Sequence, residues 1–197
     1  MALLTFPIAL ADLFDGLPIQ TTTPDLGEAL EMSQTGGGEI ITADYGPRLW
    51  KMDVTIRIGY YAEIEQVKAQ LNVLRHAGRS LLAHSMPLKA PQADPTGAIL
   101  GVSVVTLSNV HANNRQVSLS GLPAGYVLTK GDFFSYTYGS NPVRYALCQL
   151  AANATASGGG VVTDVEVTTF IRPGYTLGVA VKLIKPVFKA ILVPGSF

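Results

Sequence analysis

The amino-acid sequence predicts a mainly β fold with one packing helix. Glycine and proline are frequent, with 20 and 12 among 197 residues, and they separate short segments, as is typical of strands joined by turns. Apolar and polar residues alternate in several of these segments, whereas helical periodicity is convincing in one place. The composition is 48% apolar and 14% charged, which excludes an intrinsically disordered chain.

The clearest predicted strand covers residues 51–58. Alternate side chains of a strand point to opposite faces, so its apolar positions share one face. These positions are Met52, Val54, Ile56 and Ile58. We expect this face to lie in a core and the polar face to be solvated or paired. Further strands are predicted at residues 116–120, 165–168, 179–183 and 187–193.

The segment from Ala62 to Ala77 predicts the helix. Apolar residues recur there at spacings of three and four, which places them on one side of a helix. They are Ile64, Val67, Leu71 and Leu74. Gly78 follows at a position where a left-handed residue often ends a helix. We expect this helix to pack against a sheet and to have no chemical role.

The middle of the chain predicts an inserted module. A connector that contains Pro87, Pro91 and Pro95 disfavours regular structure. From residue 98 to residue 173, short strands alternate with turns at a density typical of a small barrel or sandwich. We therefore expect the segments before and after this module, 1–97 and 174–197, to form one unit around it.

Charge is balanced in number but uneven in order. The 14 basic residues equal the 14 acidic ones, so the chain lacks the basic excess of proteins that wrap nucleic acid. Average domains carry about 25% charged residues, and the lower share here favours an obligate oligomer. Seven acids precede the first base, Arg48: Asp12, Asp15, Asp25, Glu28, Glu31, Glu39 and Asp44. After the last acid, Glu166, come four bases: Arg172, Lys182, Lys185 and Lys189.

This order of charges has two interpretations. The two ends could attract each other, either within a subunit or between neighbours in a head-to-tail ring. Alternatively, they are separate solvated faces.

The sequence lacks the patterns of catalytic and metal sites. It has no nucleophile elbow, zinc-protease motif, phosphate loop or dinucleotide fingerprint. The three histidines, His76, His84 and His111, have no close histidine or carboxylate neighbours in sequence. The triple-glycine segments 36–38 and 158–160 lack the Lys-Ser/Thr of a phosphate loop and are predicted to be flexible hairpin tips. We therefore expect no enzymatic activity and no catalytic residue, cofactor or metal ion.

The lone cysteine and the first residues indicate the cellular compartment in which the protein is expected. Cys148 lies in the apolar run 145–150, which predicts a buried structural thiol. One cysteine cannot close an intrachain disulfide, which favours an intracellular folding environment. The first residues carry no positive charge, so a signal peptide is not expected. No run approaches the ~18 apolar residues of a membrane helix, and no membrane contact is expected.

Aromatic residues gather near the centre of the predicted module. Strand alternation places Phe134 with Tyr136 and Tyr138 on one face and Phe133 on the other. This pattern favours a core face and an interface face. The alternative is a module that recognises a host-surface glycan through Tyr136, Tyr138 and Tyr145, since exposed aromatics on small barrels can stack on ligands.

The order of motifs around these aromatics carries a resemblance. A Gly-Asp turn, Gly131–Asp132, opens the aromatic strand, and the short strand Tyr145–Leu147 and the glycine-rich turn 158–160 follow. Residues 165–174 then lead toward a final strand that begins with Lys185-Pro186-Val187-Phe188. This order, together with the earlier strand and helix, resembles the distal tail proteins of long-tailed, siphovirus-like bacteriophages.

The resemblance implies a structural protein of the virion, assembled in the host cytoplasm. In this family a β-rich belt domain closes a ring, and some members carry a small β-barrel of the oligonucleotide/oligosaccharide-binding (OB) type inserted into the belt. The belt would be residues 1–97 and 174–197, and the OB-like barrel would be residues 98–173.

The implied ring is a hexamer that links the tail tube protein to the baseplate hub protein, with DNA passing transiently through its lumen. Because acidic walls bind phosphate weakly, Asp25, Glu28 and Glu31 are candidates for the lumen lining. A tail-tube or tail-terminator ring protein and the carbohydrate-binding module remain the alternatives.

Overall fold

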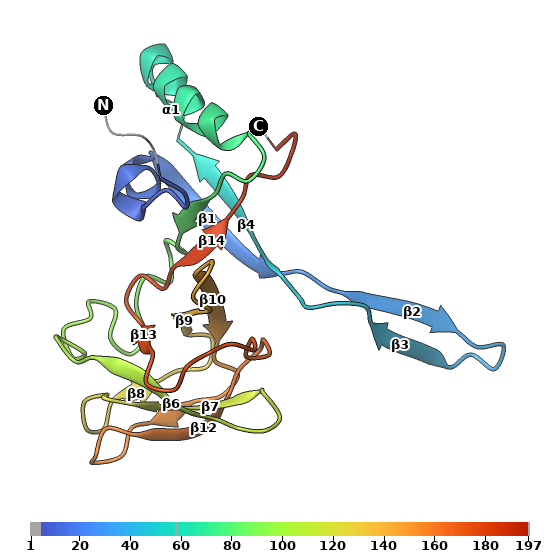
Figure 1. Ribbon diagram of the computed structural model, residues 1–197, viewed down its shortest axis with the longest axis vertical. Coiled ribbons are helices and arrows are strands. Elements are labelled where there is room, and N and C mark those ends of the chain that lie inside the picture. The colour runs from blue at the N-terminus through green and yellow to red at the C-terminus, as the bar shows by residue number, and fades with distance from the viewer. Residues whose placement is uncertain (1–4, 58, 197) are drawn as a thin grey trace.

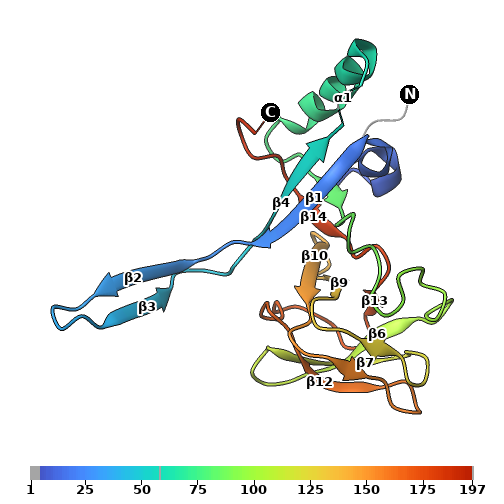
Figure 2. The same cartoon turned by 180° about the vertical axis from the view of Figure 1, so that it is seen from behind.

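A computed structural model describes residues 5–57 and 59–196, and it is mainly β. Figures 1 and 2 show a curled sheet at one end, a second group of paired strands with a helix at the other, and a hairpin that projects sideways. The mainly β prediction with one packing helix is confirmed.

The curled sheet is built from short antiparallel strands. Over the described residues it has six strands in the order β10-β9-β13-β6-β7-β12. An antiparallel bridge between Leu150 and Val167 joins the continuations of the two outer strands, so the sheet curls into a half-barrel. The strands are β6 (Val105–Val110), β7 (Gln116–Ser120), β9 (Phe133–Tyr138), β10 (Arg144–Gln149), β12 (Val162–Glu166) and β13 (Ala180–Lys182). A short pair, β8 (Val127–Leu128) and β11 (Ala154–Thr155), belongs to the same half of the molecule.

The inside of the half-barrel is the larger apolar core. Leu107, Val117, Leu119, Leu128 and Phe134 are fully buried there. Each comes from a strand whose alternate residues face inward, so the period-2 pattern of the sequence fixes this core.

The predicted edge of the inserted module at residue 173 does not coincide with the edge of this sheet. Strand β13 pairs with both β6 and β9 and therefore lies in the middle of the sheet. Val181 and Leu183 belong to its core. Pro173–Gly174 forms a turn inside this half of the molecule, because a proline-glycine turn marks a chain reversal as readily as a module boundary.

The second core joins three distant parts of the chain. The helical turns η1 (Leu10–Asp12) and η2 (Phe14–Gly16) pack against β5 (Leu81–Ala83) and β14 (Phe188–Ala190), which pair with each other. A parallel bridge joins Ile8 to Leu81. Beside them, β1 (Ile19–Leu26) pairs with β4 (Trp50–Ile56).

Phe133 and Leu147 from the half-barrel also enter this second core, where Trp50 meets both. The Trp50 indole donates to the Leu147 carbonyl at 2.9 Å, and its ring lies edge-on to Phe133 at 5.2 Å. The predicted separation of the aromatic residues into a core face and an interface face is confirmed, and the interface lies within the chain.

The predicted helix is present as α1 (Tyr61–Leu74). Leu71 and Leu74 are buried, whereas Ile64 and Val67 are only partly buried, because the first turns extend past the core (Figure 1). Gly78 is left-handed, with φ of +79°, but the helix is capped at Arg75. The prediction that Gly78 caps the helix is therefore wrong: it lies in the following turn.

The predicted strands are present, most of them with shifted or shorter bounds. Strand β7 matches its predicted range, and β12, β13 and β14 overlap theirs. In β4 the predicted apolar face is partly buried at Met52 and Ile56, while Val54 is exposed, since a two-stranded sheet leaves part of each face open. Ile58 lies outside the described residues. The connector that contains Pro87, Pro91 and Pro95 holds no helix or strand, as predicted.

Candidate functional site

A long β-hairpin leaves the body between β1 and β4. It consists of β2 (Leu30–Gln34) and β3 (Ile40–Asp44), and we call residues 27–49 the arm. The two strands pair antiparallel, from Leu30 opposite Asp44 to Gln34 opposite Ile40. Figures 1 and 2 show that the arm points away from both cores.

The tip and the root of the arm are fixed by hydrogen bonds. At the tip, the backbones of Thr35 and Glu39 bond at 2.9 Å around the Gly36–Gly38 turn, so the predicted hairpin tip at these glycines is confirmed. At the root, the Arg48 guanidinium donates to the carbonyls of Leu26 and Gly27 at 3.2 and 3.1 Å. Arg172 donates to the Arg48 carbonyl at 3.2 Å. The arm is thus anchored at its base and open along its length.

The arm exposes apolar side chains on both faces. Every residue of β2 and β3 is exposed. Met32 and Ile40 share one face by register, at 72% and 65% exposure, and Ile41 lies on the other face at 56%. Large exposed apolar areas mark interaction sites, and an isolated two-stranded hairpin is marginally stable in water. These features make the arm the candidate interaction surface.

The arm is also acidic. It carries Glu28, Glu31, Glu39 and Asp44 against one base, Arg48. In the described part of the chain, none of these four acids takes part in a salt bridge. Of the residues predicted to line a lumen, Asp25 lies near the end of β1, and Glu28 and Glu31 lie at the start of the arm, all three exposed.

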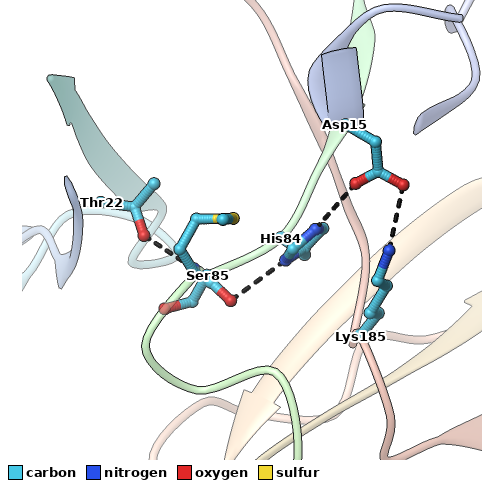
Figure 3. Close-up of polar contacts among 6 residues, drawn as sticks. Asp15, Thr22, His84, Ser85 and Lys185 are labelled. Carbon is cyan, nitrogen blue, oxygen red and sulfur yellow. Dashed lines mark hydrogen bonds and ion pairs between the residues drawn. The ribbon is translucent and has the colours of Figure 1, made fainter. Parts of the chain in front are cut away.

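One predicted attraction between the ends of the chain does form within the subunit. The Lys185 ammonium lies 3.0 Å from Oδ2 of Asp15. The other oxygen of Asp15 lies 3.1 Å from Nε2 of His84, whose side chain is 1% exposed. Figure 3 shows the three side chains meeting, from η2, from the residue after β5 and from the segment before β14. The hydrogen bond from Lys185 lowers the pKa of Asp15, burial opposes this, and the contact with His84 lowers it further.

This cluster contains the residue types of a hydrolytic triad but not its geometry. Nδ1 of His84 faces the backbone carbonyl of Ser85 at 3.1 Å, rather than a hydroxyl. The Ser85 hydroxyl is buried and has no hydrogen-bond partner among the described residues. His84 is therefore not placed to activate the Ser85 hydroxyl as a nucleophile. The adjoining cavity of about 200 Å³ is lined by four apolar residues and by four ionisable ones, Asp15, His84, Lys89 and Lys185.

The other two histidines are placed separately. His76 and His111 are both exposed, and His111 accepts a hydrogen bond from the Asn113 backbone. Across residues 5–57 and 59–196, no three His, Cys, Asp or Glu side chains gather as a metal site would require.

The tyrosines proposed for glycan recognition do not form a platform. Tyr136 is buried in the half-barrel core. Tyr145 pairs with Thr137 across the β9–β10 ladder, so it lies on the opposite face from Tyr136 and Tyr138. The glycan site predicted from these three residues is wrong, because strand alternation separates them.

Two further predictions concern single segments. Cys148 is buried, as predicted, and burial raises the pKa of its thiol to about 11. The second glycine turn is not a free tip: Gly160 packs against the backbone of Leu122, whose N–H donates to the Gly160 carbonyl at 3.1 Å.

Among the described residues, no helix has the length and apolar character to cross a membrane.

The arm and the Asp15 cluster were not found as sites from the sequence. The arm gives no burial pattern to detect, since both its faces are exposed. Asp15, His84 and Lys185 are brought together by the pairing of β5 with β14, across separations of 69 and 170 residues from Asp15.

The chain matches no family model, and no curated protein matches it in sequence.

Proposed function

We propose that the protein is a ring-forming structural subunit of a bacteriophage tail, the distal adaptor between the tail tube and the baseplate hub. The exposed arm carries the proposal. A solvent-exposed hairpin with apolar side chains on both faces is expected to be held by a neighbouring surface. The low charge content and the order of sequence motifs support the same assignment.

The neighbouring surface that fits the arm best is a second copy of this chain. Contacts between different patches of identical subunits build a ring when the rotation closes. The arm is acidic, whereas the C-terminal part offers the exposed bases Lys182 and Lys189. Opposite charges steer such contacts and fix their register. Each arm would then lie on the next subunit of the ring.

The ring would act by geometry rather than by chemistry. Six copies would enclose a lumen for DNA, one face docking on the tail tube protein and the other on the hub protein. The exposed acids Asp25, Glu28 and Glu31 suit a wall past which DNA must slide, because they offer phosphate no cations to hold.

A subunit of the tail tube or the tail terminator is the second candidate, since the arm equally supports other rings. The two classes differ in how rings associate. Tube subunits stack into long polymers, whereas an adaptor or terminator forms rings that stay single.

The test is light scattering and native mass spectrometry of the purified chain, followed by negative-stain imaging. We expect closed single rings in the wild-type protein. The variant Met32→Ser/Ile40→Ser/Ile41→Ser loses three apolar side chains that are half to three-quarters exposed in the single subunit. Their burial would contribute about 4 kcal/mol of binding free energy to each contact between subunits. The dissociation constant of each contact should therefore rise by about 1,000-fold.

The control is Val102→Ser, because Val102 is fully exposed and lies outside the arm. This variant should assemble like the wild-type chain. A triple variant that forms rings at wild-type concentrations would show that the arm does not close them. A wild-type chain that stays monomeric at its highest attainable concentration would contradict the proposed self-assembly.

A further inference from the structure

Both ring nitrogens of His84 face hydrogen-bond acceptors. Nε2 lies 3.1 Å from a carboxylate oxygen of Asp15, and Nδ1 lies 3.1 Å from the carbonyl oxygen of Ser85. Figure 3 shows the imidazole between these two groups. Neither a carboxylate nor a carbonyl can donate a hydrogen bond.

A neutral imidazole carries one N–H and can satisfy one of these acceptors, whereas an imidazolium satisfies both. With a neutral ring, a bare nitrogen would face the other acceptor at 3.1 Å, lone pair against lone pair. The His84 side chain is 1% exposed, whereas that of Asp15 is 33% exposed, so water can reach the carboxylate but not the ring. We propose that His84 is held as an imidazolium, and that its second proton is a pH-sensitive clamp between the N-terminal segment and the body of the protein.

The charged groups around His84 agree with this protonation state. Asp15 comes from η2, and Lys185, before β14, binds the other oxygen of the same carboxylate. Lys89 lines the adjoining cavity, which is otherwise bounded near His84 by apolar side chains such as Phe14 and Met86. One carboxylate therefore lies between two cations, each on its own oxygen, and stabilises the charge on both.

The clamp ties together segments that carry the arm. Asp15 fixes η2, which leads directly into β1. Two residues after His84, the Met86 N–H donates to the Thr22 hydroxyl of β1 at 2.8 Å. Strand β1 continues into the arm. Loss of the His84 proton would leave one acceptor unpaired and loosen η2 and the start of β1, whether or not the subunits form a ring.

The first measurement is the ring-nitrogen NMR spectrum of the full-length, ¹⁵N-labelled chain over a pH series. His76, which is exposed, is the internal reference. At a pH where His76 is mostly neutral, we expect His84 to show two protonated nitrogens. A His84 ring with one protonated nitrogen at that pH overturns the proposal.

The second measurement is hydrogen exchange of the backbone amides of η1 and η2, corrected for the intrinsic pH dependence of exchange. As pH rises and His84 loses its proton, protection should fall by about tenfold, the effect of one buried group left unpaired. In His84→Gln this step should vanish, and in the control His76→Gln it should remain. A step that survives in His84→Gln overturns the clamp.

The variant Asp15→Asn keeps the inference testable if His84→Gln does not fold. An asparagine amide can donate to a neutral Nε2, so His84 should become neutral at a pH where it is charged in the wild-type protein. An unchanged ring-nitrogen spectrum in Asp15→Asn also contradicts the proposal.

Discussion

The glycine turn before β12 contains two positions that should respond oppositely to one added methyl group. Gly160 has φ of +71°, and a Cβ there would overlap the carbonyl oxygen of Leu122. Two residues earlier, a Cβ on Gly158 would meet open space, and its φ is not in the left-handed region. The pair Gly160→Ala and Gly158→Ala therefore compares the same substitution in a packed and an open site of one turn.

The expected cost of Gly160→Ala follows from these contacts. A left-handed alanine costs about 1–2 kcal/mol. The Leu122 carbonyl must also move, which strains the hydrogen bonds of Gly160 with Leu122 and Ser157, at 3.1 and 2.9 Å, each with a net value of about 1 kcal/mol. We expect the free energy of unfolding to fall by about 2–4 kcal/mol in total.

Urea unfolding followed by far-UV circular dichroism measures both variants. Gly158→Ala should unfold within about 0.5 kcal/mol of the wild-type chain or become slightly more stable. Equal unfolding midpoints for the two variants would refute the reasoning, because they would show that Gly160 is as unconstrained as the free tip expected from the sequence.

Three further outcomes follow from burial and charge. Because burial raises the pKa of Cys148 to about 11, a thiol reagent at pH 8 should label the protein only after denaturation; labelling of the native chain would show that the half-barrel opens. Leu71→Asp buries a carboxylate in the second core and should lower the free energy of unfolding by about 3 kcal/mol, measured by heat or urea. The control Ala69→Asp, on the exposed side of α1, should change stability little. Equal melting of the two variants would contradict the orientation of the helix. The pKa of Asp15 is lowered from 3.8, first by Lys185, so its ionised form contributes stability that is present above pH 3.8 and is lost as pH falls through the lower folded value. Lys185→Met should therefore move the midpoint of acid unfolding to higher pH, and an unchanged midpoint would exclude this contribution.

The sequence predicted the elements that are buried on one face. In β7, Val117 and Leu119 alternate with polar residues because one face packs into the half-barrel, and the pattern is visible without a structure. Cys148 was placed correctly for the same reason. The helix was found from its apolar spacing, although its first turns extend past the core and only Leu71 and Leu74 are buried.

The sites escaped prediction for two different physical reasons. The arm is exposed on both faces, so neighbouring apolar residues such as Ile40 and Ile41 form neither a strand nor a helix pattern. The Asp15 cluster depends on pairing between β5 and β14, which is a property of the topology rather than of any local segment. The edge of the half-barrel was misplaced because a Pro-Gly turn is a local signal, and it does not say which sheet the next strand will join.

Trp50 gives the protein a natural optical reporter of the joint between its two cores. It is the single tryptophan of the chain, and its indole bonds to the Leu147 carbonyl while its ring packs on Phe133. Both partners belong to the half-barrel, whereas Trp50 belongs to β4. A change in tryptophan emission would therefore record separation of the two halves, even under conditions where the secondary structure of each half stays intact.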